Sequence, residues 1–453
     1  MTSRLPPGRL PPGRLPSGRI PAGRIPAGYL PAHGSTAYRA LHYDLDLEYR
    51  LAANRLAGRA LISAEACEPL DTVELDLGPL RVTRVTVDGR PPRRHTHAAG
   101  KLRLSLGRRL AAGTRFTVEV VYAGNPRPVR SHWGEVGWEP LTDGVLVASQ
   151  PSGARSWFPC NDHPADKAGY RIAITTGSAY AVLANGTLVD GRVRGSTTRW
   201  VYEHPEPTST YLASVQIGQY VVRESPAGSV MLRSAVPSRL LAGYAHDFGR
   251  QDRMMAVFED LFGRYPFAGY TVVVTDDELE IPVEAQSMSI FGANHVDGRR
   301  GSERLIAHEL AHQWFGNSLT PRDWRHIWLN EGPANYAEWL WSEWSGGPTA
   351  AVHAASAWQR LAADRQDLVL ADPGVERMFD DRVYLRGALT MHALRRHLGD
   401  GEFFEFLREW TDTHRHGLVD TPAFTTLATA RSPAAAALLT AWLLDPVLPP
   451  LPR

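Results

Sequence analysis

One segment of the sequence, His308-Glu309-Leu310-Ala311-His312, has residue types and spacing suited to hydrolysis at a metal ion. On an α-helix, residues four apart lie on the same face, about 6 Å apart along the axis, so both imidazoles can bind one ion. Glu309 lies beside them and can accept a proton from a water polarised by that ion. The segment therefore predicts a metal site with its own general base.

Zinc that catalyses hydrolysis needs a third protein ligand and an open fourth position. Glu331 follows His312 after 18 intervening residues, at the start of a second segment with helical periodicity. Glu338 lies two helical turns beyond Glu331 on the same face, where it can orient a ligand imidazole. Two His and two Glu could also lie on solvated helix faces, but the aromatic and aliphatic flanks predict burial. We therefore expect one Zn²⁺ held by His308, His312 and Glu331.

The elements that position these residues follow from hydrophobic periodicity. Leu41 to Tyr49 alternates apolar and polar residues, which is typical of a half-buried strand, and similar runs recur up to Tyr211–Val215. Residues 35–223 are predicted to form an all-β, antiparallel sandwich-like domain. Residues 224–445 are predicted to be mainly helical, with a strand at Tyr270–Val274. Ser302 is the expected N-cap of the helix with both histidines, and Gly316-Asn317 its end.

The two ends of the chain differ from this pattern. Residues 1–34 contain a five-residue repeat of Pro, Gly and Arg, which predicts an extended, disordered tail, and residues 446–453 form a proline-rich tail. The 453 residues carry a formal net charge of +1, which argues against nucleic acid or an anionic membrane surface as partner. With two cysteines and no long apolar run, we expect a cytoplasmic protein. The oligomeric state is left open.

Four motifs in the same order resemble those of the zinc aminopeptidases that include aminopeptidase N and leukotriene hydrolase. They are QPSGAR at 150–155, FPCNDHP at 158–164, HELAHQWFGN at 308–317 followed by WLNEG at 328–332, and YLRGA at 384–388. The resemblance covers residues 36 to 445. It implies a short, two-domain, bacterial type of enzyme, with a β domain followed by a thermolysin-like catalytic domain.

The resemblance also implies a role for each matching residue. His308, His312 and Glu331 correspond to zinc ligands, and Glu309 to the general base. Tyr384 corresponds to a tyrosine that stabilises the oxyanion, and Gln150 and Glu284 to residues that anchor the free α-amine of a peptide substrate. The last position departs from the family, whose Gly-Ala-Met-Glu-Asn is replaced here by Ile-Pro-Val-Glu-Ala at residues 281–285, which include Glu284. The expected reaction is removal of the N-terminal residue from peptides.

Two other functions fit the same zinc site. One is an inactive zinc-binding scaffold that holds peptides, against which the presence of Glu309 and Tyr384 argues. The other is hydrolysis of a non-peptide substrate, such as the epoxide chemistry of the leukotriene hydrolase. Nothing in the sequence indicates a lipid-shaped tunnel.

Overall fold

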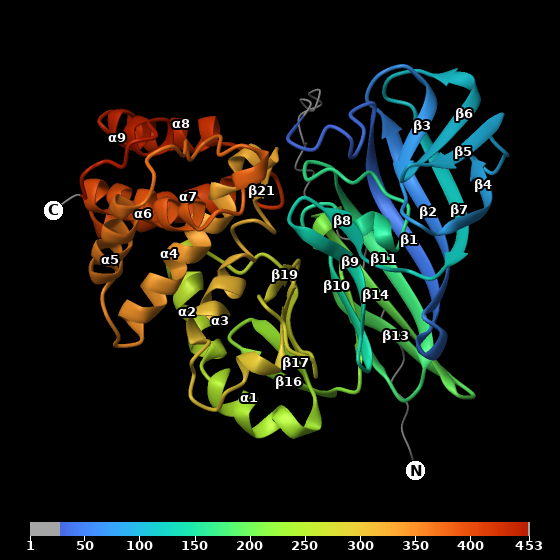
Figure 1. The fold of residues 1–453 in the computed structure, drawn as a ribbon, viewed down its shortest axis with the longest axis horizontal. Helices are drawn as coiled ribbons and strands as arrows, with labels where there is room; N and C mark the ends of the chain where they lie inside the picture. Colours follow the sequence, from blue (N-terminus) through green and yellow to red (C-terminus); the bar gives the residue numbers. More distant parts are fainter. Residues whose placement is uncertain (1–27, 452–453) are drawn as a thin grey trace, which may run out of the picture.

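The structure, a computed structural model, describes residues 28–451. Figure 1 shows a β-rich part, blue to green, beside a mainly helical part, yellow to red. No helix within residues 28–451 is long and apolar enough to cross a membrane.

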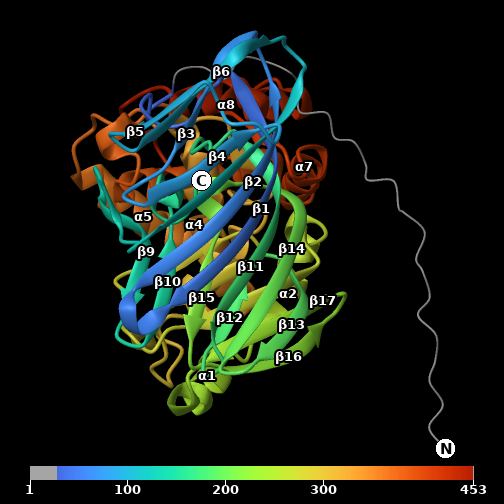
Figure 2. The ribbon, with the colours of Figure 1, turned by 90° about the vertical axis from the view of Figure 1, so that its right-hand side faces the viewer.

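The β-rich part is built on a seven-stranded sheet, shown from its outer side in Figure 2. Its strands, in order across the sheet, are β13 (Thr187–Arg194), β14 (Thr197–Ser209), β11 (Lys167–Gly177), β1 (Tyr38–Arg50), β2 (Arg55–Ala66), β7 (Arg115–Gly124) and β4 (Arg81–Val87). A five-stranded sheet has the order β12 (Ala181–Ala184), β15 (Val215–Gly218), β10 (Gly144–Ala148), β9 (Gly134–Leu141) and β8 (Val129–Ser131). A three-stranded sheet has the order β3 (Leu70–Asp76), β6 (Lys101–Leu110) and β5 (Arg94–Ala98).

The alternation of apolar and polar residues in β1 places the apolar side chains in the core, as predicted. Tyr43, Leu45 and Leu47 are buried, whereas Glu48 is exposed. The buried side chains of the seven-stranded sheet form one cluster with those of the two smaller sheets, so the layers share a core. The sheet is not purely antiparallel, because β1 pairs with β11 in parallel.

The second part combines a mixed five-stranded sheet with helices. The sheet has the order β16 (Val221–Ala227), β17 (Val230–Val236), β18 (Gly269–Val274), β20 (Met288–Phe291) and β19 (Val283–Ala285). The helices are α1 (Leu241–Asp247), α2 (Gln251–Phe262), α3 (Glu303–Ala311), α4 (Trp328–Trp344), α5 (Ala350–Ala363), α6 (Asp381–Leu398), α7 (Asp400–Thr413), α8 (Thr421–Arg431) and α9 (Ala435–Leu443). A short parallel pair joins β21 (Thr320–Pro321) to β22 (Leu418–Val419).

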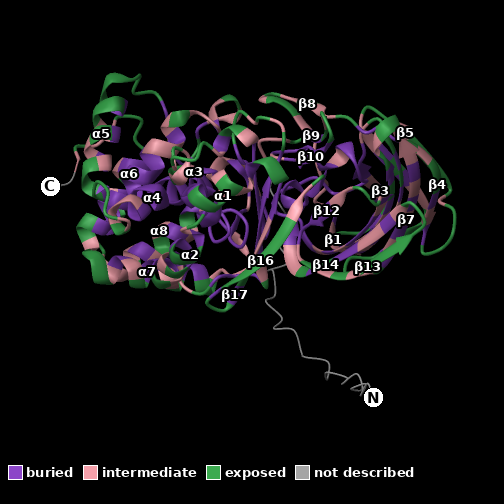
Figure 3. Cartoon of the chain, turned by 90° about the horizontal axis from the view of Figure 1, so that it is seen from below, coloured by how far each residue is buried: buried purple, intermediate pink, exposed green. Residues whose placement is uncertain are grey.

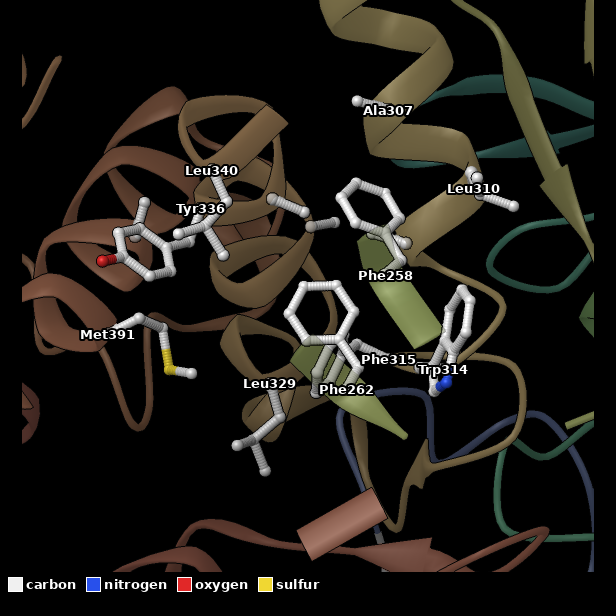
Figure 4. Close-up of a cluster of buried hydrophobic side chains, with 14 of the residues drawn as sticks. Phe258, Phe262, Ala307, Leu310, Trp314, Phe315, Leu329, Tyr336, Leu340 and Met391 are labelled. Carbon is white, nitrogen blue, oxygen red and sulfur yellow. The ribbon is translucent and has the colours of Figure 1, made fainter. Parts of the chain in front are cut away.

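Helices α3 and α4 lie in the core of this part. Figure 4 shows aromatic side chains of α2 packed beside α3 and the residues that follow it, and Figure 3 shows buried residues gathered along α4 and α6. Gly332 of α4 and Gly387 of α6 let these two helices approach closely, because a Cβ on Gly332 would lie 2.8 Å from the Gly387 Cα. Any larger residue at either position would push apart the helices that carry Glu331 and Tyr384.

Some predicted boundaries need correction. β16 straddles the predicted boundary between residues 223 and 224 and pairs within the sheet of the second part. The expected strand at Tyr211–Val215 is instead a 3₁₀ turn, Thr210–Leu212, followed by β15. Ser302 does precede α3, but its side chain makes no capping hydrogen bond.

Both predicted tails contact the folded chain where the structure describes them. Tyr29 and Leu30 pack against the core of the second part, and the Pro449 carbonyl accepts a 2.8 Å hydrogen bond from Trp358 Nε1. The predicted disordered tail is therefore wrong for residues 28–34, and residues 446–451 are docked. Residues 1–27, 452 and 453 lie outside the described part.

Candidate metal and peptide site

Three predicted metal ligands meet in the structure. One ligand atom each of His308, His312 and Glu331 lies within 4.8 Å of the others, and all three residues are buried. Glu331 Oε2 is 3.5 Å from His308 Nε2 and 3.4 Å from His312 Nε2. His312 lies just after the last residue of α3 but keeps helical backbone angles, so the i, i+4 geometry is preserved.

Each imidazole is oriented through its other nitrogen. His308 Nδ1 lies 2.8 Å from Glu338 Oε1, as predicted for the supporting acid, and His312 Nδ1 lies 3.0 Å from the Phe315 carbonyl oxygen. Both Nε2 atoms are thereby free to face the Glu331 carboxylate. The site thus offers two imidazole Nε2 atoms and one carboxylate, while the Nδ1 atoms are engaged elsewhere. This arrangement fits a catalytic zinc ion.

Glu338 has further partners that the sequence did not reveal. Arg304 Nη1 donates to Glu338 Oε2 over 3.1 Å, and Asn335 Nδ2 donates to Oε1 over 2.9 Å. Arg304 lies four residues before His308, so the i, i+4 spacing was a signal that could have identified it. These contacts hold the carboxylate that orients His308.

Charge in the site is distributed unequally among the carboxylates. Although burial favours its neutral form, His312 and His308 hold the pKa of Glu331 at about 2, so it stays ionised as a metal ligand requires. Burial raises the pKa of Glu309 to about 8; the neighbouring His308 and His312 lower it, and the acids Glu284 and Glu331 raise it. Glu309 Oε2 is buried and has no hydrogen-bond partner among the residues described.

Glu284, Gln150 and Tyr384 lie around the triad. Gln150 Nε2 donates a 2.6 Å hydrogen bond to Glu284 Oε1, although the two residues come from different parts of the molecule. Burial raises the pKa of Glu284, while His312 lowers it. The Tyr384 ring lies parallel to the His308 ring, with centroids 6.2 Å apart. All the residues singled out from the sequence are thus brought to one place.

The two-part fold and the His-Glu-His-Glu site define a zinc metallopeptidase. Residues 39–212 match the peptidase M1 N-terminal domain, and residues 246–442 match the peptidase family M1 domain. The M1 zinc metallopeptidase from Deinococcus radiodurans has a similar structure, with a TM-score of 0.87 and 31% identity, covering 94% of this chain and 99% of that one. The chain belongs to peptidase family M1.

Other relatives include longer enzymes. Endoplasmic reticulum aminopeptidase 1 of Homo sapiens is 26% identical over 421 residues, which is 83% of this chain and 44% of that protein. Aminopeptidase N of Lactococcus lactis is 27% identical over 329 residues, 65% of this chain and 38% of that protein. The chain thus spans less than half the length of these relatives. A variant of the Deinococcus radiodurans enzyme has been solved with a Tyr-Ser-Ala substrate bound.

Proposed function

We propose that this protein is a zinc-dependent aminopeptidase that removes the N-terminal residue from peptides with a free α-amine. The observation that carries the proposal is the Gln150–Glu284 pair beside the triad, because it adds a half-buried carboxylate that neither zinc binding nor proton transfer requires. The aminopeptidase names of the relatives support the same activity. The peptide bound to the Deinococcus radiodurans variant supports a peptide substrate.

His308, His312 and Glu331 would hold the zinc ion, with Glu338 and the Phe315 carbonyl orienting the imidazoles. When bound, zinc supplies Lewis-acid polarisation of the scissile carbonyl and lowers the pKa of a water. Glu309 takes the water proton on its unpartnered Oε2 and returns it to the leaving amine. The Tyr384 hydroxyl donates a hydrogen bond to the oxygen on which negative charge develops.

Glu284 and Gln150 are assigned to the α-ammonium group of the substrate. The Gln150 amide nitrogen donates to Glu284, which leaves the Gln150 carbonyl oxygen as an additional acceptor for the ammonium. An ionised carboxylate beside a desolvated ammonium fixes the position of the first residue, so that the first peptide bond reaches the zinc. Cleavage then releases one residue from the N-terminus.

The test compares aminoacyl amides and short peptides with free and with acetylated N-termini, with and without a chelator. We expect the free amine to be favoured by about 2–5 kcal/mol in kcat/KM, because acetylation removes the positive charge that would pair with the Glu284 carboxylate. Chelation should abolish both activities. Equal rates on free and acetylated substrates would contradict the aminopeptidase assignment. If the protein hydrolyses no amide in a chelator-sensitive way, that result would favour a scaffold or a non-peptide substrate.

We also propose a cytoplasmic location, with neither nucleic acid nor membrane as partner. Both cysteines are free and one is buried, as is usual in a reducing compartment, and the net charge is close to zero. Cell fractionation that recovers the protein with cytosolic markers would support this location, and recovery with secreted proteins would contradict it.

A further inference from the structure

The strand that carries Glu284 is poorly supported by its own sheet. β19 has three residues, lies at the edge of the sheet and pairs with β20 alone, with Ala285 opposite Met288. The tight turn between them includes Ser287, whose φ of +62° lies in the left-handed region that most residues avoid. A short edge strand that enters such a turn needs other contacts to hold it in place.

Gln313 supplies three of those contacts. Its side chain is fully buried, and its Nε2 donates to the Ala285 carbonyl over 3.1 Å and to the Met288 carbonyl over 3.4 Å. Its Oε1 accepts a 2.8 Å hydrogen bond from the Ser287 backbone nitrogen. One amide therefore satisfies backbone groups on both sides of the turn and holds the strained residue between them.

Asn317 adds a single contact from the same segment. Its Nδ2 donates to the Ala285 carbonyl over 3.0 Å, while its Oδ1 has no partner among the described residues. Gln313 directly follows His312, and Asn317 lies four residues after Gln313. The segment that begins with a metal ligand thus also holds the residue next to Glu284.

We infer that Gln313 is a positioning residue that sets the place of Glu284 relative to the metal triad, with Asn317 in a secondary role. The inference rests on the proposed function, since it assumes that Glu284 binds the substrate amine. Without the Gln313 amide, the Ser287 nitrogen loses its acceptor and the Ala285 carbonyl keeps only the bond from Asn317, so the Glu284 carboxylate moves relative to the zinc ligands. The effect should fall on recognition of the free amine, not on the metal.

The experiment uses Gln313→Met, which keeps the side-chain length and removes all three hydrogen bonds, and Asn317→Ala, which removes one. Gln251→Met is the matched control, because Gln251 is also buried but its Nε2 has no partner among the described residues. Zinc content and thermal midpoint are measured first. The readouts are kcat and KM on free and acetylated substrates, and binding of L-tryptophan and N-acetyl-L-tryptophan by calorimetry of the zinc-loaded protein.

We expect Gln313→Met to retain zinc, to raise KM for free-amine substrates and to reduce the preference for the free amine at least tenfold in kinetics and in binding. Asn317→Ala should reduce the preference for the free amine, in kinetics and in binding, by a smaller factor than Gln313→Met. Gln251→Met should leave that preference unchanged. A fall in kcat with the preference intact in Gln313→Met would overturn the inference. If that variant does not fold, an unchanged preference in Asn317→Ala overturns it. A wild-type protein without any preference contradicts the proposed function itself, and the inference with it.

Discussion

The two imidazoles of the triad are oriented by partners of different chemistry. His312 uses a backbone carbonyl, which a substitution cannot remove, whereas His308 depends on the carboxylate of Glu338. A carboxylate on the distal nitrogen fixes the ring and increases the basicity of the nitrogen that faces the metal. At the scale of residues, His308 is therefore the imidazole ligand whose orientation a single side-chain substitution can disturb.

Glu338→Gln is expected to weaken zinc affinity by about 10–100-fold without unfolding the protein. The amide can still accept from Nδ1, but it lacks the charge that polarises the imidazole and pairs with Arg304. Competition with a chelator of known zinc affinity measures the change. Glu343→Gln is a suitable control, because Glu343 lies on the same helix and pairs with Arg395 away from the triad. Identical chelator midpoints for the two variants would contradict the role of Glu338.

Glu309→Gln is expected to keep zinc and the fold but to lower kcat by about 10²–10⁴-fold. The amide preserves the shape of the side chain but cannot take a proton from water. Metal analysis and the thermal midpoint report whether the site is intact, and steady-state kinetics report the loss. Near-wild-type turnover with full zinc occupancy would show that another group is the base.

At the scale of elements, a single lysine links β11 to the loop after α3. Lys167 is one of two lysines among 49 basic residues, and its Nζ donates to the Asn317 and Ser318 carbonyls over 3.0 and 2.8 Å. It donates to the Gly417 carbonyl over 3.5 Å. The ammonium group of lysine carries three N–H donors, which matches the three carbonyls that converge on it. The lysine thus joins the β-rich part to the segment that holds the triad.

Burial lowers the pKa of Lys167 to about 7, and this predicts a pH-dependent contribution to stability. Between pH 7 and pH 10 the unfolded chain binds more protons at this lysine than the folded chain, so the lysine's contribution rises with pH. We expect the stability difference between wild type and Lys167→Met to grow by about 2 kcal/mol in favour of wild type from pH 7 to pH 9. Denaturant unfolding at the two pH values measures it. A constant difference would mean that Lys167 stays charged throughout.

At the scale of the whole molecule, residues 28–35, which precede β1 in the sequence, contact both the β-rich part and the helical part. The Tyr29 hydroxyl donates to Asp372 and accepts from the Gly374 backbone nitrogen over 2.8 Å, both in the helical part. The Gly34 nitrogen donates to Asp76 over 2.9 Å in the β-rich part. A segment that bonds both parts restricts their relative movement across the site.

A chain that starts at residue 35 is therefore expected to be less stable than one that starts at residue 28. Removing residues 28–34 removes these hydrogen bonds to Asp372 and Asp76, at a cost of about 0.5–1.5 kcal/mol for each bond. Scanning calorimetry of the two truncated proteins measures the difference as a lower midpoint for the shorter chain. The chain from residue 28 is the control, and equal midpoints would show that the segment contributes no stability.

The sequence by itself determined the chemistry of the metal site. His308, Glu309 and His312 are related to one another by helical spacing, and so are Glu331 and Glu338, and such spacing can be read without knowing how helices pack. The prediction that the two segments share one ion rests on the separation of 18 residues and on the family resemblance. The strands of the β-rich part were visible for the same reason, because alternation reports which face of a strand is buried. Alternation does not report the partner strand, and so neither the parallel β1–β11 pair nor the place of β16 in the second sheet was predicted.

Tertiary structure decided the contacts between distant segments. Gln150 and Glu284 are 134 residues apart, and only the packing of the two parts brings their side chains within 2.6 Å. The same holds for the bonds of Gln313 to the turn after Glu284, and for the docking of Tyr29, where a polar, proline-rich composition predicted no contact. Such contacts depend on which surfaces meet after the elements have formed, and no local periodicity records that choice.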